Sequence, residues 1–185
     1  MKHLLLVFSG PSGVGKGTVV KQLLKKGNYA LSVSCTTRLP RPGEKDGEAY
    51  FFIGKDKFTE LIESGGFLEY SNHFENYYGT PKKFVEDKLE NSDVILEIEV
   101  DGALQVKKSY PDAVLIMLLP PSVEELRSRL VKRGAESAEK IEERIKRMEY
   151  EVSKKEEYDY IVINDDLKST VGEIEKIIER ERGLK

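Results

Sequence analysis

The residues with the clearest chemical meaning form a glycine-rich segment near the N-terminus, with the sequence GPSGVGKGT. Its glycines let the backbone turn tightly and point N–H groups inward, and its lysine can reach the terminal phosphates of a nucleoside triphosphate. An ordinary glycine-rich turn between a strand and a helix would not need a lysine at that spacing. The segment therefore predicts a phosphate loop. It consists of Gly10, Pro11, Ser12, Gly13, Val14, Gly15, Lys16, Gly17 and Thr18.

The loop departs from the usual pattern directly after Lys16. Ser or Thr is expected there to hold a Mg²⁺ ion, but Gly17 occupies the position and the hydroxyl belongs to Thr18. One position along a helix turns a side chain by about 100 degrees. Either Thr18 binds the ion from its shifted position, or water completes the shell of the ion, as Mg²⁺ readily allows.

A second set of candidate anion ligands lies in the segment RLPRPGE, which contains Arg38 and Arg41. Its two prolines stiffen the backbone and hold the two guanidinium groups near each other. Paired guanidinium forks suit a phosphate, although two solvated loop arginines would be the simpler interpretation of this segment alone. Tyr50 and Tyr78 could add phenolic O–H donors, although aromatic residues in short strands more often belong to a core.

The elements that must position these residues alternate along the chain. Four apolar runs lack polar alternation, which is typical of parallel strands buried on both faces. The runs span residues 4–8, 94–98, 113–119 and 160–163, and helical patterns span residues 16–26, 102–109, 122–132 and 167–182. The third helical pattern opens on a capping box formed by Ser122 and Glu125. This alternation predicts a doubly wound α/β core whose ligands lie beyond the carboxyl ends of the strands.

Two stretches interrupt this alternation. The first contains short aromatic strands at residues 50–53 and 67–70 around a helix at 57–64, which predicts an inserted, mainly β subdomain. Residues 137–157 form a highly charged helical stretch with few apolar residues, which we expect to pack poorly into a core and to belong to a mobile lid. The predicted organisation is a single domain, 1–185, with a core of 1–32, 80–132 and 158–185, an insertion of 33–79 and a lid of about 133–157.

Composition limits the partners. The chain has 185 residues and a formal net charge of −3, so no bulk positive field attracts it to nucleic acid or to an anionic membrane. An anionic ligand must be bound by a local cluster instead. The single Cys35, the lack of a cysteine–histidine cluster and the short apolar run at the N-terminus predict a cytoplasmic protein without a structural metal.

Several further motifs occur in a fixed order along the chain. They are SVSCTTRLPRPGE, EAYFF, GFLEY, NYYGTP and LEIEVDGA, with KRG and NDD closer to the C-terminus. Together with the phosphate loop, they resemble the guanylate kinase family over nearly the whole chain. The resemblance implies a P-loop α/β fold with a GMP-binding insertion and a helical lid. It also implies transfer of a phosphoryl group from ATP to GMP, and by extension to dGMP, with Mg²⁺ as the cofactor.

The resemblance also implies a set of acceptor-site residues. The phosphate of GMP is expected to meet Arg38, Arg41, Tyr50 and Tyr78. The guanine base is expected to meet Ser34, Glu69, Thr80 and Glu99. A carboxylate facing the N1–H and N2–H₂ donors of guanine would make the pocket selective, because adenine would leave it unpaired. Two other interpretations stay open, since Thr80 before a proline could cap a helix and Glu69 could lie on the surface.

Glu97 and Glu99 share one face near the end of a strand, where two carboxylates are too costly to bury without partners. The guanylate kinase family usually has Asp at both positions. We assign Glu99 to the guanine base. We assign Glu97, together with Thr18, to Mg²⁺ or its water shell.

The lid and the ATP base have their own candidates. By the same resemblance, Arg133 and Arg144 match lid arginines, which together with Lys16 and Arg38 would neutralise the transferring phosphoryl group. Asn164 matches a position near the ATP base. Taken alone, the two lid arginines would be solvated helix charges, and Asn164 could cap the turn into the last helix.

Two rival functions stay open on the sequence alone. A related kinase could phosphorylate AMP or a ribose phosphate, and a non-catalytic guanylate-kinase-like domain could bind phosphopeptides. Glu69 and Glu99 favour guanine as the acceptor base, and Lys16 in an intact phosphate loop favours catalysis.

Overall fold

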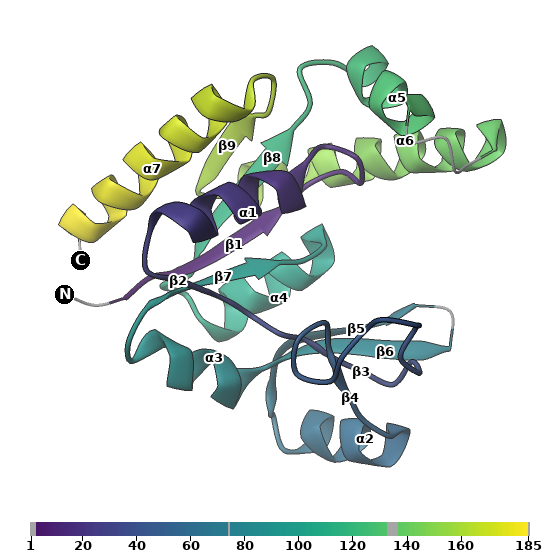
Figure 1. Ribbon diagram of the computed structural model, residues 1–185, viewed down its shortest axis with the longest axis vertical. Helices are drawn as coiled ribbons and strands as arrows, with labels where there is room; N and C mark the ends of the chain where they lie inside the picture. The colour runs from purple at the N-terminus through teal and green to yellow at the C-terminus, as the bar shows by residue number, and fades with distance from the viewer. Residues whose placement is uncertain (1–2, 74, 133–136, 185) are drawn as a thin grey trace.

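A five-stranded parallel sheet forms the centre of the protein (Figure 1). The computed structural model describes residues 3–73, 75–132 and 137–184. The strands follow the order β2, β7, β1, β8, β9, and every neighbouring pair is parallel. Their bounds are β1 Leu5–Ser9, β2 Tyr29–Leu31, β7 Asp93–Glu97, β8 Val114–Leu119 and β9 Tyr160–Ile163. Because β1 and β7 are adjacent and parallel, the residues that follow them lie at the same edge of the sheet.

Helices cover both faces of this sheet (Figure 1). Their bounds are α1 Lys16–Lys26 and α7 Leu167–Leu184 on one face, and α3 Lys82–Leu89 and α4 Val100–Ser109 on the other. Alternate residues of β1 supply the two cores, with Leu6 and Phe8 in one and Leu5 and Val7 in the other. Burial on both faces explains the lack of polar alternation in this strand. The prediction of a doubly wound parallel sheet is confirmed.

Two elements of the core carry no clear sequence pattern. β2 is a strand of three residues at the edge of the sheet, where it pairs with β7 and stays partly accessible to solvent. α3 follows a strand directly, and Val85 is its buried residue. Short and partly exposed elements offer few apolar positions from which a period could be read, so the sequence does not predict these two.

A second sheet of four strands, in the order β4, β3, β6, β5, lies beside the core (Figure 1). Its bounds are β3 Cys35–Thr36, β4 Phe51–Phe52, β5 Phe67–His73 and β6 Asn76–Pro81, and the neighbouring helix is α2 Lys55–Glu63. Cys35, Phe58 and Phe67 form its small core. β5 and β6 are antiparallel, and their register sets Glu69 opposite Thr80. The mainly β character that the sequence predicts for this region is present.

Two helices follow β8 and lie near the carboxyl edge of the parallel sheet (Figure 1). They are α5 Val123–Lys132 and α6 Ala138–Ser153, and the short 3₁₀ helix η1 Lys155–Glu157 leads on to β9. The hydroxyl of Ser122 accepts a hydrogen bond of 3.1 Å from the main-chain N–H of Glu125. Ser122 therefore caps α5 as predicted, but the carboxylate of Glu125 bonds to Arg129 at 2.9 Å, so only one half of the predicted capping box is seen.

The expectation that residues 137–157 pack poorly is wrong. Ile141, Ile145 and Met148 are buried along one side of α6, where they form a separate core with Leu126 and Leu130 of α5. Three apolar residues spaced by four and three positions are enough to give a charged helix one apolar stripe. α6 is therefore held by its own small core and directs its charged residues elsewhere.

Candidate active site

The phosphate loop joins β1 to α1 and has the backbone that its glycines predict. Gly10, Gly13 and Gly15 have φ angles of 134, 93 and 103 degrees, which L side chains rarely adopt. A Cβ atom on Gly10 would lie 2.1 Å from the main-chain oxygen of Leu118, so β8 passes too close for a larger residue. The loop therefore has the tight turn of an anion-binding segment at the N-terminus of a helix.

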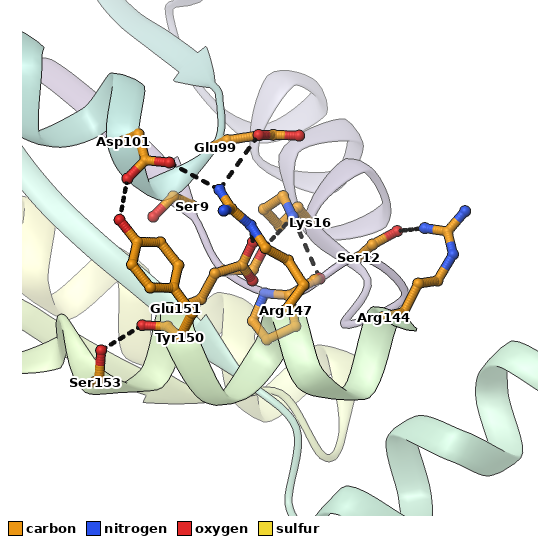
Figure 2. Close-up of polar contacts among 12 residues, drawn as sticks. Ser9, Ser12, Lys16, Glu99, Asp101, Arg144, Arg147, Tyr150, Glu151 and Ser153 are labelled. Atoms are coloured by element: carbon orange, nitrogen blue, oxygen red, sulfur yellow. Dashed lines mark hydrogen bonds and ion pairs between the residues drawn. The ribbon is translucent and has the colours of Figure 1, made fainter. Parts of the chain in front are cut away.

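Two predicted catalytic cations meet at this loop. Lys16 is the first residue of α1, and its Nζ donates hydrogen bonds to the main-chain oxygens of the first two loop residues. Arg144 of α6 donates a hydrogen bond to the hydroxyl of Ser12 (Figure 2). Arg133, the other predicted lid arginine, lies outside the described residues.

Asn164 braces the loop rather than capping the final helix. Its Nδ2 donates to the main-chain oxygen of Val14 at 2.7 Å. The cap before α7 is Asp166, whose carboxylate accepts a 2.8 Å hydrogen bond from the N–H of Ser169, so the capping interpretation of Asn164 is wrong. Arg129 of α5, which the sequence patterns do not single out, donates to the main-chain oxygens of both Val14 and Asn164. Two side chains from distant elements thus fix the loop.

A cavity of about 350 Å³ lies beside this brace. It is lined by Gly13, Val14, Gly15, Thr18, Arg129, Lys132, Asn164, Asp165 and Leu167. Thr18 and Asn164 therefore face the same space. The cavity opens next to the phosphate loop, where the base of a bound nucleotide would be expected.

A second cavity, of about 460 Å³, collects side chains from both sheets; we call it the acceptor cavity. It is lined by Ser34, Tyr50, Glu69, Ser71, Tyr78, Glu97, Ile98, Glu99, Asp101 and Gly102. A smaller cavity of about 150 Å³ shares Ser34, Tyr50 and Glu97 with it and adds Thr80. Five of the eight GMP ligands implied by the resemblance therefore line the larger cavity, and Thr80 lines the smaller.

Thr80 holds the buried acid Glu69 in place. Its hydroxyl donates a 2.6 Å hydrogen bond to Oε1 of Glu69, and both residues are buried. Thr80 belongs to β6, and α3 begins after Pro81 without a side-chain cap, so the capping interpretation of Thr80 is wrong. The interpretation of Glu69 as a surface residue is wrong as well. A Cβ atom on Gly102 would lie 2.9 Å from Oε2 of Glu69, so the glycine leaves room for the second carboxylate oxygen.

Arg38 is held by an acid that the sequence patterns do not single out. Its guanidinium group forms two hydrogen bonds of 3.0 Å with the carboxylate of Glu44, which also accepts one of 2.7 Å from the main-chain N–H of Arg41. The hydrogen bond between the two side chains raises the pKa of Arg38 and lowers the pKa of Glu44. The guanidinium carbon lies 5.5 Å from the centre of the Tyr50 ring, which lies 5.9 Å from that of Tyr78. Arg38 and the two tyrosines therefore form one cluster at the acceptor cavity.

Glu97, at the end of β7, connects the acceptor cavity to the phosphate loop. A Cβ atom on Gly17 would lie 3.5 Å from both carboxylate oxygens of Glu97, so this acid faces the start of α1. Although its side chain reaches solvent, desolvation by the surrounding protein raises the pKa of Glu97, against the charges of Lys16 and Lys21. Thr18 lines the other cavity, so the two residues predicted to bind Mg²⁺ do not line the same cavity. The described residues include no group of three or more His, Cys, Asp or Glu side chains that could hold a metal.

The helix α6 contacts the acceptor cavity as well as the loop (Figure 2). Arg147 lies 2.8 Å from the carboxylate of Asp101 and 3.7 Å from that of Glu99, and both acids line the cavity. Its Nε lies 3.4 Å from the carboxylate of Glu151. The hydroxyl of Tyr150 donates a 2.6 Å hydrogen bond to Asp101. The sequence patterns do not single out these four contacts.

Known proteins are similar in sequence over nearly the whole chain. The model of the guanylate kinase family matches residues 2–181. A guanylate kinase of Clostridioides difficile (strain 630) is 52% identical over 183 residues, which cover 98% of this chain and 89% of the relative. A guanylate kinase of Caldanaerobacter subterraneus subsp. tengcongensis is 50% identical over 181 residues, which cover 97% of this chain and 88% of the relative.

A solved structure supports the same relationship. The crystal structure of guanylate kinase from Anaplasma phagocytophilum superposes with a TM-score of 0.75 at 34% identity, covering 97% of this chain and 86% of that one. A crystal structure of a protein from Eubacterium ventriosum, 16% identical with a TM-score of 0.54, shares the fold alone. The phosphate loop, the acceptor cavity beside it and these matches lead to one conclusion: the chain belongs to the guanylate kinase family.

Proposed function

We propose that this chain transfers the γ-phosphoryl group of ATP to GMP, giving ADP and GDP. The observation that carries the proposal is the acceptor cavity, where the buried acid Glu69 and a second acid, Glu99, lie beside a phosphate loop. Carboxylates suit the N1–H and N2–H₂ donors of guanine. Adenine lacks this donor pair and would leave a buried carboxylate unpaired, which disfavours AMP.

The acceptor nucleotide is held from two sides. Guanine meets Glu69, Glu99 and Ser34, and Thr80 acts through the oxygen of Glu69 to which it donates. The phosphate of GMP meets Arg38, Arg41, Tyr50 and Tyr78. Glu44 keeps Arg38 in position and leaves it charged, since the pKa of Arg38 is raised by their hydrogen bond.

The donor nucleotide occupies the other side of the loop. Residues 10–18 bind its phosphates through inward N–H groups and the ammonium group of Lys16. Its base enters the cavity of about 350 Å³ that includes Asn164. Because the side-chain amide of Asn164 already donates to Val14, we infer that Asn164 shapes this cavity and does not read the base through that donor.

The residues at the loop fit Mg²⁺ bound mainly by phosphates and water. This ion keeps several waters and needs only one or two carboxylates from the protein. Glu97 faces the start of α1 across Gly17, which leaves space between them, so Glu97 suits a partner of the water shell. Thr18 is the remaining hydroxyl candidate, from the opposite side of the loop. When bound, the ion would neutralise charge on the β and γ phosphates.

The reaction needs no protein base, because the phosphate of GMP is already an anion. One of its oxygens bonds to the γ-phosphorus while the bond from that phosphorus to the bridging oxygen of ADP breaks. Lys16, Arg38 and Arg144, with Arg133 as a further candidate, offset the negative charge that these two polyanions bring together. Closure of the lid would exclude water and so limit hydrolysis of ATP.

The test is an ADP-release assay with GMP, dGMP, AMP and UMP as acceptors. We expect turnover with GMP and dGMP, and a kcat/KM for AMP lower by at least about 10²-fold, because a buried carboxylate would lose its partners. Equal turnover with AMP would support a related kinase instead. Binding of GMP without binding of ATP would support a non-catalytic domain.

The same proposal covers partners and location. The substrates are small molecules, and we expect no nucleic-acid or membrane partner, because the net charge of −3 provides no bulk positive field. Within the described chain, no helix combines the length and apolar character needed to cross a bilayer. We propose that the protein acts in nucleotide metabolism and is located in the cytoplasm.

A further inference from the structure

The helix α6 directs four polar side chains toward the phosphate loop and toward the start of α4 (Figure 2). They are Arg144, Arg147, Tyr150 and Glu151, at spacings of three or four positions that bring side chains onto one face of a helix. Arg144 donates to the phosphate loop, whereas Tyr150 donates to Asp101 at the acceptor cavity. α6 therefore contacts the donor side and the acceptor side at once.

The guanidinium group of Arg147 contacts acids on two sides. Its Nη2 lies 2.8 Å from Asp101 and 3.7 Å from Glu99 in the wall of the acceptor cavity. Its Nε lies 3.4 Å from Oε1 of Glu151. The guanidinium carbon also lies 4.7 Å from the centre of the Tyr150 ring, which limits the positions that it can take. Arg147 thus links the acceptor cavity to Glu151.

Glu151 continues this link toward the phosphate loop. Its side chain is only 6% exposed, and within the described chain its Oε2 has no hydrogen-bond partner. Burial raises the pKa of Glu151, while the charges of Lys16 and Arg147 act in the opposite direction. Figure 2 shows the carboxylate of Glu151 beside Lys16. A buried, incompletely paired carboxylate lowers stability, so its presence there indicates a functional role.

We propose that Arg147 and Glu151 are positioning residues that couple occupancy of the acceptor cavity to the charge balance at Lys16. The inference rests on the proposed function, in which Glu99 binds guanine and Lys16 binds the phosphates of ATP. Arg147 and Glu151 act through Glu99 and Lys16 and need no contact with either nucleotide.

The direction of the coupling follows from shared charges. When the N–H donors of guanine bind Glu99, the attraction between Glu99 and Arg147 becomes weaker. Arg147 then pairs more strongly with Glu151. Glu151 in turn competes less for Lys16, whose ammonium group becomes more available to the phosphates of ATP. Binding couplings are reciprocal, so ATP must strengthen the binding of GMP by the same factor.

Isothermal titration calorimetry tests this directly. The Kd for GMP is measured with and without a saturating non-hydrolysable ATP analogue and Mg²⁺. For the wild type we expect the analogue to lower the Kd for GMP at least about fivefold, the lower end of typical couplings. Arg147→Gln and Glu151→Gln should each reduce this factor below about twofold. The double variant should lose no more than either single variant, because both residues act in one chain of contacts.

Two further variants separate coupling from simple packing. Arg147→Lys keeps the charge and should retain most of the coupling. Arg127→Gln removes the ion pair with Glu142 between α5 and α6, away from both cavities, and should leave the coupling factor unchanged. Circular dichroism checks that each variant is folded, and Glu151→Gln carries the test alone should Arg147→Gln fail to fold.

The outcomes separate this inference from the proposed function. A wild-type coupling factor below about twofold would overturn the inference, as would full coupling in folded Glu151→Gln or an equal loss in Arg127→Gln. Each of these results is compatible with normal turnover of GMP. No formation of GDP from ATP and GMP by the wild type would instead overturn the proposed function.

Discussion

The phosphate loop and the acceptor cavity both suit anions, but they are built from different parts of the chain. The loop consists of nine consecutive residues whose glycine backbone fits against β8. The acceptor cavity gathers side chains from both sheets, over residues 34–102, and several of them are fixed by other side chains. The binding groups of the loop therefore come from its own backbone, which Arg129 and Asn164 only brace, whereas the acceptor cavity depends on how separate elements pack.

Substitution of the lysine in the loop should have the largest effect. Lys16→Met removes the positive charge at the transferring phosphoryl group, so we expect kcat to fall by about 10³-fold. The Kd for GMP alone should rise by no more than about twofold, because Lys16 does not line the acceptor cavity. Steady-state kinetics and calorimetry measure the two quantities. An equal loss of GMP binding would contradict the separation of the two sites.

A smaller effect, confined to the acceptor, is expected for Arg41→Met. Loss of one charge-assisted hydrogen-bond donor to the phosphate should raise the KM for GMP about 10- to 100-fold, and the KM for ATP much less. The main-chain bond from residue 41 to Glu44 survives the substitution, so the turn that holds Arg38 should persist. Equal changes in both KM values would argue against a phosphate site at this arginine.

A smaller effect should show whether the hydrogen bond from Thr80 positions Glu69 in the acceptor cavity. Thr80→Val keeps the shape but removes the donor to a buried carboxylate, so the KM for GMP should rise about tenfold. Thr80→Ser keeps a hydroxyl and serves as the matched control, with a KM within about threefold of the wild type. If both variants behave alike, the hydrogen bond does not position Glu69.

The smallest expected effect concerns stability and pH. The pKa of Glu151 is raised in the folded protein, so the stability linked to its neutral form is present at low pH and is lost as the pH rises through the folded pKa. The Glu151→Gln variant lacks this titrating group. Its free energy of unfolding, relative to that of the wild type, should therefore increase between pH 4 and pH 8. Urea denaturation at the two pH values measures the change. A constant or decreasing difference would show that ionised Glu151 is well accommodated.

Contiguous or strongly periodic features were the ones predictable from sequence. Such features depend only on their own residues, as in the loop of residues 10–18 and the strands β1, β8 and β9. The observed bounds of these strands lie close to the predicted ones. β2 and α3 are too short and exposed to give such a pattern. In α6, the apolar stripe of Ile141, Ile145 and Met148 was hidden by the surrounding charges.

The roles of individual polar residues depended on partners far away in the chain. Thr80 and Asn164 each occupy a position where a cap was plausible, yet one bonds to Glu69 and the other to Val14. Glu44 could have been identified from its place in the same stiff segment as Arg38 and Arg41, because a lone acid there needs a cationic partner. Arg129 and Arg147 offered no such local indication among many charged helix residues.

By itself, the sequence determined the parallel α/β core, the phosphate loop and the chemical nature of the acceptor residues. These properties arise from backbone preferences, periodicity and side-chain chemistry, which depend on residues that are close together in the chain. Only the tertiary structure decided that Gly17 faces Glu97, that Thr80 bonds to Glu69, and that Arg147 lies between Asp101 and Glu151. Each of these contacts joins separate elements, and the distance between two such side chains is fixed by packing rather than by their separation in the chain.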